Sequence, residues 1–347
     1  MDPRLTEYDE HYPQYVQVEQ IVSDLITANL RSAHITPMQI THRVKTRESV
    51  AGKLVRKSEK YPTLDNMTDL IGFRIICYFS DQVDEIASFL RRLFVVDSKN
   101  SIDKRSAIPA TAFGYISLHY ICTLPRSGAY PEDLCNIPFE FQIKSVLQHT
   151  WAEIEHDLGY KTEFGVPREI RREFSRVAGL LEIADELFLN IKEKLDVYKE
   201  TVRENIANDQ AYDMNIDLIT LTEYLRHSKT MKALLSEIAS ITGAVIEETD
   251  PEAYIPQLAF FEIHTLGELK TFMETEHDGA LLLARNALAG AELDTLTSIV
   301  GLYYLMRSRL TFGNYSEDQI AAFFRLQMDD ETRIRNQTQR ILKRRGL

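Results

Sequence analysis

The sequence predicts an α+β protein in which a region of alternating strands and helices is followed by a region of helices alone. Segments with the period-2 alternation of half-buried strands occur in the first 200 residues, and the clearest is PFEFQIKS at 138–145. From residue 201 onward, strand signals nearly vanish and apolar residues recur at helical spacing. We therefore expect two domains, residues 1–200 with a β-sheet and an all-helical C-terminal domain at residues 201–347.

Composition and charge restrict the class of protein. The chain is 44% hydrophobic and 27% charged, which is typical of a globular protein, and its net charge is −12. This charge argues against a generally basic nucleic-acid coat, although a local basic patch can bind phosphates. No apolar run is long enough to span a bilayer, and the acidic start MDPRLTEYDE is unlike a signal peptide. Three cysteines without CxxC spacing fit a reducing compartment, so we expect a cytoplasmic protein with no membrane partner.

The first region contains a series of predicted elements. A helix is expected from about residue 5 to residue 33, and a short amphipathic helix is expected around Val50, Leu54 and Val55. The β-rich run DLIGFRIICYF predicts a strand at 69–79. The later elements, in order, are a helix at 82–93, a short strand at 94–97, a polar loop at 98–112, strands at 113–125 and 138–145, and a helix from Val146.

The clearest helix of the chain begins at Pro167, a residue that suits the first turn of a helix. Apolar residues follow at spacings of four and three, which is the pattern of a heptad seam, and we expect this seam to pack on another helix or on the sheet. The seam consists of Ile170, Phe174, Val177, Leu181, Ala184, Phe188, Ile191 and Leu195. The basic tail RIRNQTQRILKRRGL is interpreted first as a solvated helix end, with a phosphate or RNA contact as the alternative.

Two of the predicted strands can place polar side chains on a single face of the sheet. The two polar rows are Glu140, Gln142 and Lys144 in PFEFQIKS, and Tyr115, Ser117 and His119 in GYISLHYICT. If both strands belong to one sheet, an acid, an amide, a base, an aromatic ring, a hydroxyl and an imidazole meet in one cleft. A solvated outer face of an antiparallel sheet is the structural alternative.

An acid and several cations precede these strands. Asp69 and Arg74 are five residues apart, so we expect Asp69 in the turn before the strand, with Gly72 permitting a bend or bulge. The cations are Arg43, Lys45, Arg47, Lys53, Arg56 and Lys57. Two carboxylates, Asp69 and Glu140, amid cations suit a magnesium–polyphosphate ligand, because Mg²⁺ prefers carboxylate oxygens and keeps phosphate oxygens in its shell. Neither a P-loop nor a GxGxxG motif is present.

Four motifs in this order resemble the synthetase domain of the RelA/SpoT family. They are RVKTRESVAGKLVRK, DLIGFRIICYF, GYISLHYI and FEFQIKSVLQHTWAEIEHDLGYK, and the resemblance covers about residues 15–200. It implies a mixed β-sheet flanked by helices, similar to nucleotidyltransferases. It also implies the family's activity, which is transfer of pyrophosphate from ATP to the 3′-hydroxyl of GDP or GTP. The products are the stringent-response alarmones (p)ppGpp, and AMP is released.

The resemblance further implies a role for individual residues. Asp69 would hold Mg²⁺, and Glu140 would share the metal and accept the proton of the attacking hydroxyl. The ATP-binding residues would be Arg43 and Arg74 on the adenine, and Lys45, Lys53 and Ser49 at the phosphates. The acceptor-binding residues would be Tyr115, Ser117, His119, Gln142, Lys144, His156 and Lys161. No hydrolase activity is expected, because the few residues before the motifs cannot hold the family's hydrolase domain.

The departures from the family pattern lie on the acceptor side. Ile116 stands where many members carry arginine, and Lys144 replaces a common arginine, which removes a bidentate fork. The loop SAIPATAF lacks the usual Lys and Asn, for which Lys99, Lys104 or Arg105 could substitute. ATP donation is therefore predicted more firmly than the identity of the acceptor.

These departures leave alternatives to alarmone synthesis. One is a toxic relative that pyrophosphorylates tRNA 3′ ends or adenine nucleotides, and the other is a non-catalytic nucleotide-binding regulator. A separate metal site in EIEHD at 153–157 is a minor alternative, because no second histidine follows at the helical spacing of a zinc site. The helical C-terminal region matches no pattern that assigns it a role. Autoinhibition, partner binding and a homo-oligomer all remain open.

Overall fold

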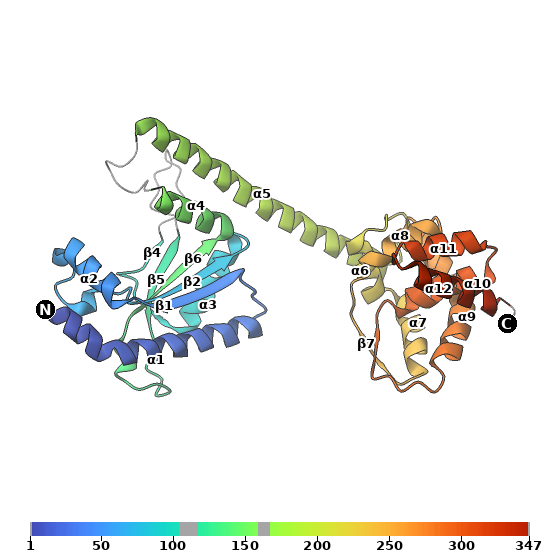
Figure 1. Ribbon diagram of the computed structural model, residues 1–347, viewed down its shortest axis with the longest axis horizontal. Helices are drawn as coiled ribbons and strands as arrows, with labels where there is room; N and C mark the ends of the chain where they lie inside the picture. The colour runs from blue at the N-terminus through green and yellow to red at the C-terminus, as the bar shows by residue number, and fades with distance from the viewer. Residues whose placement is uncertain (1, 104–116, 159–166, 346–347) are drawn as a thin grey trace. The chain divides into compact units, whose positions relative to one another are not determined.

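A six-stranded mixed sheet lies in the first of the two compact units into which the chain divides, residues 1–192 and residues 193–347 (Figure 1). The computed structural model describes residues 2–103, 117–158 and 167–345. The strands are β1 (Gln39–Val44), β2 (Ile71–Cys77), β3 (Val95–Val96), β4 (Ile102–Asp103), β5 (Leu118–Thr123) and β6 (Phe139–Ser145). Their order is β1-β2-β6-β5-β3, with β4 paired to β5, and β2 runs parallel to β6 while the other pairs are antiparallel. This confirms the mixed sheet.

Helices cover both faces of this sheet. The helices up to residue 207 are α1 (Pro3–Ser32), α2 (Arg47–Arg56), α3 (Asp81–Leu93), α4 (Val146–Asp157) and α5 (Arg168–Ala207), with 3₁₀ turns at Ser58–Lys60, Leu64–Asn66 and Leu134–Asn136. Figure 1 shows α1 and α3 on one side of the sheet and α4 on the other. Each start has a local cause: Asp2 caps α1 ahead of Pro3, and Ser145 forms a capping box with Gln148 at α4.

The aromatic core fixes which way β6 faces. Phe73, Phe139 and Phe141 are almost fully buried, and the rings of Phe73 and Phe141 lie 5.2 Å apart between centroids. Such a pair contributes about 0.5–1.5 kcal/mol beyond its buried area. Because side chains alternate along a strand, burying Phe139 and Phe141 against α1 and α3 directs Glu140 and Gln142 to the opposite face.

Two details of the first unit correct the sequence interpretation. Val55 belongs to α2 but is 85% exposed, because it lies one position beyond the buried stripe of Val50 and Leu54. The predicted polar loop at 98–112 contains the short strand β4, which pairs with β5. The three cysteines, Cys77, Cys122 and Cys135, are free and buried, which agrees with the absence of a disulfide framework.

The predicted packing of the α5 seam is confirmed only in part: the seam residue Phe174 packs against Trp151 of α4, with 5.4 Å between the ring centroids. Two contacts beside the seam also attach α5 to the first unit: Asp185 accepts a hydrogen bond from Ser145, and Lys192 pairs with Asp81. Most of the seam stays at the surface, as shown by Val177, which is 46% exposed. The other exposed apolar residues of α5 are Ile170, Leu180, Ile183, Leu187, Phe188, Ile191, Leu195 and Val197.

The second unit is built of helices around its own core. They are α6 (Leu218–His227), α7 (Lys229–Ser240), α8 (Ile255–Phe260), α9 (Leu266–Leu288), α10 (Val300–Phe312), α11 (Glu317–Arg325) and α12 (Glu331–Arg344), with a 3₁₀ turn at Glu252–Tyr254. A Cβ added at Gly279 of α9 would lie 2.1 Å from Ser308 Oγ of α10, so glycine permits their close approach. The expectation of helices alone is corrected by a parallel pair of short strands, β7 (Val245–Glu247) and β8 (Thr295–Thr297). Within the described ranges, no helix is both long and apolar enough to cross a membrane.

Candidate active site

Cross-strand pairing brings polar residues of four strands onto one face of the sheet. The pairs are Arg43 with Gly72, Gly72 with Glu140, Arg74 with Gln142, and Gln142 with His119. The predicted sharing of a face by the two polar rows is therefore confirmed for the residues that the structure describes. Tyr115, at the start of one row, lies outside the described residues.

A cavity of about 300 Å³ opens on this face. Its lining comes from β1, β2, β6 and the turn before β2, and includes Thr41, His42, Arg43, Lys45, Asp69, Leu70, Gly72, Phe73, Arg74, Glu140 and Gln142. A Cβ added at Gly72 would meet no atom within 4 Å. The absence of a side chain at this position therefore leaves space for a ligand between Arg43 and Glu140.

Asp69 is held between two lysines. It lies in the turn before β2, as predicted, but the pairing of β1 with β2 is regular through Gly72, so the suggested bulge is absent there. The Oδ2 atom of Asp69 lies 2.9 Å from Lys45 Nζ and 2.5 Å from Lys53 Nζ. Burial opposes ionisation of Asp69, but the hydrogen bond from Lys53 and the charge of Lys45 outweigh it and lower the pKa.

The other oxygen of Asp69 fits a metal ligand. Oδ1 is buried and has no hydrogen-bond partner among the described residues. A buried carboxylate oxygen without a partner is costly, and a divalent cation would satisfy it. No group of three or more metal-ligating side chains is present in the described part of the chain, so the remaining ligands of such a cation would be phosphate oxygens and water.

Glu140 belongs to a hydrogen-bonded chain with Ser117 and His119. His119 Nδ1 lies 2.7 Å from Glu140 Oε1, and His119 Nε2 lies 2.6 Å from Ser117 Oγ. Gln142 Nε2 donates to Glu140 Oε2 over 2.9 Å. Burial again opposes ionisation, yet the hydrogen bond and charge of His119 and the bond from Gln142 lower the pKa of Glu140, while the charge of Asp69 partly offsets this effect. Both carboxylates are therefore ionised at neutral pH.

The two arginines predicted for the adenine both line the cavity. Arg43 and Arg74 come from neighbouring strands. Arg74 Nη1 also lies 3.0 Å from Oε1 of Glu153 on α4, and His149 Nδ1 is 3.7 Å from the same oxygen. Sequence reasoning considered Glu153 only as a metal ligand in EIEHD, because nothing in the sequence signals a contact between α4 and β2.

Other predicted residues lie away from the cavity. Ser49 is exposed and bonds to Thr46 at the start of α2, and His156 is exposed on α4. Neither lines the cavity. Lys144, two residues after Gln142 on β6, is buried. The pKa of His149 is lowered mainly by the burial of that histidine, and the positive charge of Lys144 contributes to the same effect. Lys161, Ile116, Lys104 and Arg105 lie outside the described residues.

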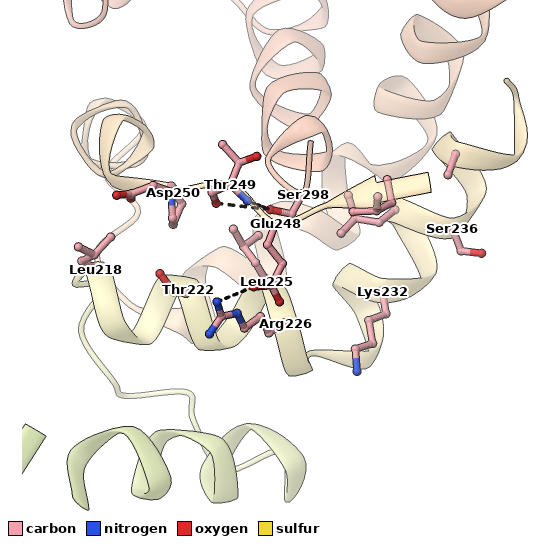
Figure 2. A pocket seen from close by; sticks show the side chains of 14 residues that line it. Leu218, Thr222, Leu225, Arg226, Lys232, Ser236, Glu248, Thr249, Asp250 and Ser298 are labelled. Atoms are coloured by element: carbon pink, nitrogen blue, oxygen red, sulfur yellow. Dashed lines mark hydrogen bonds and ion pairs between the residues drawn. The ribbon is translucent and has the colours of Figure 1, made fainter. Parts of the chain in front are cut away.

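A larger cavity, of about 790 Å³, lies in the second unit. Figure 2 shows that it is walled by α6, α7 and the segments that follow β7 and β8. Arg226 of its wall pairs with Glu248 over 2.6 Å, and the Thr249 amide donates to Ser298 Oγ. Its principal acid and base therefore neutralise each other. Size alone does not select the active site, and we place it at the smaller cavity because the two ionised carboxylates are there.

Comparison with known proteins identifies a family and two similar proteins. The family described as "Region found in RelA / SpoT proteins" matches residues 42–164. The chain is 29% identical over 174 residues to GTP pyrophosphokinase YwaC of Bacillus subtilis, covering 48% of this chain and 80% of that protein. It is 30% identical over 154 residues to GTP pyrophosphokinase YjbM of the same organism, covering 44% of this chain and 71% of that protein.

Solved structures also align with slightly more than half of the chain. The crystal structure of small alarmone synthetase 1 from Bacillus subtilis is 23% identical, with a TM-score of 0.45, over 55% of this chain and 98% of that one. A GTP pyrophosphokinase family protein from Streptococcus pneumoniae is 26% identical, with a TM-score of 0.44, over 55% of this chain and 94% of that one.

Proposed function

The chain belongs to the RelA/SpoT family, and from this premise we propose that it transfers pyrophosphate from ATP to the 3′-hydroxyl of GDP or GTP. The products would be (p)ppGpp and AMP. The observation that carries the proposal is the cavity in which Asp69 and Glu140 lie among Arg43, Lys45 and Arg74. Two carboxylates amid cations suit transfer of a phosphoryl group, in which positioning and electrostatics supply most of the catalysis.

Glu140 would act as the general base. The acceptor 3′-oxygen attacks the β-phosphorus of ATP, the bond from that phosphorus to the oxygen bridging it to the α-phosphorus breaks, and AMP leaves with the bridging oxygen. The 3′-hydroxyl proton passes to Glu140, which is ionised because His119 and Gln142 stabilise its charge. A purely regulatory cavity would not require this poised carboxylate.

Asp69 and the lysines would organise the triphosphate. Asp69 Oδ1 and Glu140 are the residues that would hold Mg²⁺, which when bound neutralises charge on the phosphate oxygens. Lys45 and Lys53 contact Asp69 Oδ2 in the free protein, and their ammonium groups would bind phosphate oxygens of ATP when it enters the cavity. Arg43 and Arg74 would stack on the adenine.

The acceptor side is proposed from fewer residues. Ser117, His119 and Gln142 lie on the same face as Glu140, whereas Tyr115 and Lys161 stay predictions. Both curated relatives are named GTP pyrophosphokinases, which favours a guanosine acceptor over tRNA or an adenine nucleotide. We assign this activity to residues 1–200 and leave residues 201–347 outside the catalytic step. A cytoplasmic location is retained as a proposal.

We also propose that α5 supports self-association. Its exposed heptad seam is an apolar stripe on a 40-residue helix, and such stripes mark interaction sites. A second copy of the chain offers a stripe of the same spacing, so a symmetric pair of α5 helices would cover both.

The experiment that tests the activity is acceptor profiling. Purified protein, Mg²⁺ and ATP labelled in its β- and γ-phosphates are mixed separately with GDP, GTP, ATP without label and deacylated tRNA. Label in a guanosine product that is lost in Glu140→Gln supports the proposal. Label only in tRNA or in adenine nucleotides contradicts the acceptor assignment, and label in no product contradicts the activity.

Glu140→Gln serves as the catalytic control because it changes one oxygen to an amide of the same shape. We expect it to fold like the wild type and to lose about 10²–10⁴-fold in rate, which is the usual contribution of a general base. Matching circular dichroism spectra establish the fold. A rate within tenfold of the wild type contradicts the role of Glu140.

A further inference from the structure

Three of the second unit's arginines that have no carboxylate partner among the described residues lie on the packed helices α10 and α12. Arg307 lies on α10, and Arg340 and Arg344 lie on α12. The neighbouring Arg333, in contrast, pairs with Asp330. In a chain with a net charge of −12, a group of unpaired cations is an unusual feature that the proposed activity does not use.

Arg307 is fixed in place by its neighbours. Its guanidinium carbon lies 4.8 Å from the ring centroid of Tyr303 and 4.6 Å from that of Phe324. Nη1 donates a hydrogen bond to Gln337 Oε1 of α12 over 3.0 Å. The side chain is half-buried. Because these contacts are to rings and to a neutral amide, they orient the guanidinium but leave its positive charge without a counter-ion.

The contact with Gln337 also places the other two arginines. Arg340 and Arg344 are three and seven residues beyond Gln337, so all three lie on the same face of α12, the face that meets Arg307. Buried Ile334, Thr338 and Ile341 form the neighbouring core stripe of the helix. Arg335 lies on the opposite side of α12 from Gln337.

The electrostatics of the cluster are unfavourable without an anion. Burial lowers the pKa of Arg307, and the charges of Arg344 and Arg340 lower it further, while Tyr303 opposes them. The dipole of α12 stabilises cations only in its last turn, so it accounts for Arg344 but not for Arg307 or Arg340. A solvated helix end, the first interpretation of the basic tail, therefore does not explain the cluster.

We propose that Arg307, Arg340 and Arg344 bind a nucleoside polyphosphate in the second unit. Three guanidiniums call for an anion of more than one charge, and their paired N–H groups match phosphate oxygens. Tyr303, which is 39% exposed and already in contact with Arg307, offers an aromatic surface for the base. This site is separate from the cavity at Asp69 and does not depend on the proposed activity.

The test is calorimetric titration of the full-length chain with GTP, with inorganic tripolyphosphate and with a single-stranded RNA oligonucleotide. The active-site variant Arg43→Ala/Lys45→Ala provides the background, so that heat from the first unit is reduced. Arg340→Glu/Arg344→Glu reverses two charges of the cluster. Arg335→Glu is the control, because it reverses one charge on the opposite side of the same helix.

We expect GTP to bind the background variant and to bind at least tenfold more weakly when the cluster is reversed, with no change in Arg335→Glu. Tyr303→Ala should weaken the binding of GTP more than the binding of tripolyphosphate. Equal weakening of both ligands by Tyr303→Ala overturns the base contact. Binding unaffected by the cluster variant overturns the site, and binding of RNA alone overturns the nucleotide assignment. Because the readout is binding, failure here leaves the pyrophosphate transfer untouched.

Discussion

His119 Nδ1 lies 2.7 Å from Glu140 Oε1, and this contact holds the carboxylate of Glu140 in its ionised form. The other ring nitrogen of His119 is occupied by Ser117 Oγ, so the imidazole is oriented from both sides. A general base needs to be ionised before it can accept a proton. The relationship therefore connects the geometry of two strands to the pH at which the enzyme works.

Removing His119 should shift the pH dependence of the reaction. In His119→Gln the pKa of Glu140 rises because its principal stabilising partner is lost, so Glu140 becomes protonated at a higher pH. The acid limb of the profile of kcat/KM against pH should move upward. His42→Gln is the matched control, since His42 lines the same cavity but bonds to Ser23 and Glu19. An unchanged acid limb in His119→Gln contradicts this positioning role.

Filling the space above Gly72 should block ATP without unfolding the protein. Gly72→Val adds a side chain that meets no atom within 4 Å in the free protein and points between Arg43 and Glu140. Valine also suits a strand, so we expect a change in stability within about 1 kcal/mol. ATP affinity should fall at least tenfold by calorimetry.

The control for Gly72→Val is Ile75→Val, on the core face of the same strand. It should cost about 0.5–1.5 kcal/mol in urea unfolding and leave ATP affinity unchanged. If Gly72→Val binds ATP as tightly as the wild type, the adenine is placed elsewhere.

Arg74 should bind ATP more readily when Glu153 is neutralised. The ion pair of 3.0 Å between them must break if Arg74 stacks on the adenine, and both side chains are more than a third exposed. Because exposed pairs of this kind contribute about 0–1 kcal/mol, Glu153→Gln should lower the KM for ATP by up to about fivefold with kcat unchanged. Asp157→Asn, near the end of the same helix, is the control. A higher KM in Glu153→Gln would show that Glu153 assists ATP instead of competing for Arg74.

The lysines that contact Asp69 should make the free energy of unfolding depend on pH in the acidic range. The pKa of Asp69 is lower in the folded protein than its ordinary value, so its contribution is complete above the unfolded pKa of about 3.9 and is lost as pH falls through the folded pKa. Lys53→Met removes the strongest stabilising contact and raises the pKa of Asp69. Because the folded pKa of Asp69 then lies closer to its unfolded value, the loss of stability between pH 6 and pH 3 should be smaller in Lys53→Met than in the wild type, as measured by urea unfolding. Lys57→Met, an exposed lysine after α2, should leave the pH dependence unchanged.

Charges placed on the α5 seam should dissociate any oligomer. Phe188→Glu/Ile191→Glu changes two seam residues that are each 52% exposed, so the monomer should fold normally. Light scattering should give a multiple of the chain mass for the wild type and the single mass for the variant. Glu186→Gln/Glu193→Gln, at nearby positions of the same helix, is the control. A wild type that is monomeric at micromolar concentration contradicts self-association.

The sequence by itself determined the strands of the first unit and the face on which their polar residues lie. Period-2 alternation depends only on local backbone geometry, so PFEFQIKS located both the buried Phe139 and the polar row from Glu140 on the opposite face. The five-residue separation of Asp69 and Arg74 likewise placed Asp69 in the turn before β2. These features are local, and a local pattern is sufficient to specify them.

Tertiary structure decided what depends on contacts between distant segments. The pairing of β2 with both β1 and β6 set Arg43, Gly72 and Glu140 side by side, and the position of α4 joined Glu153 to Arg74. The local sequence around each of these residues does not predict which distant residue it will contact. The same reason explains two errors of prediction. Whether the α5 seam is buried, and whether residues 102–103 form a strand, depends on the distant segments that each contacts.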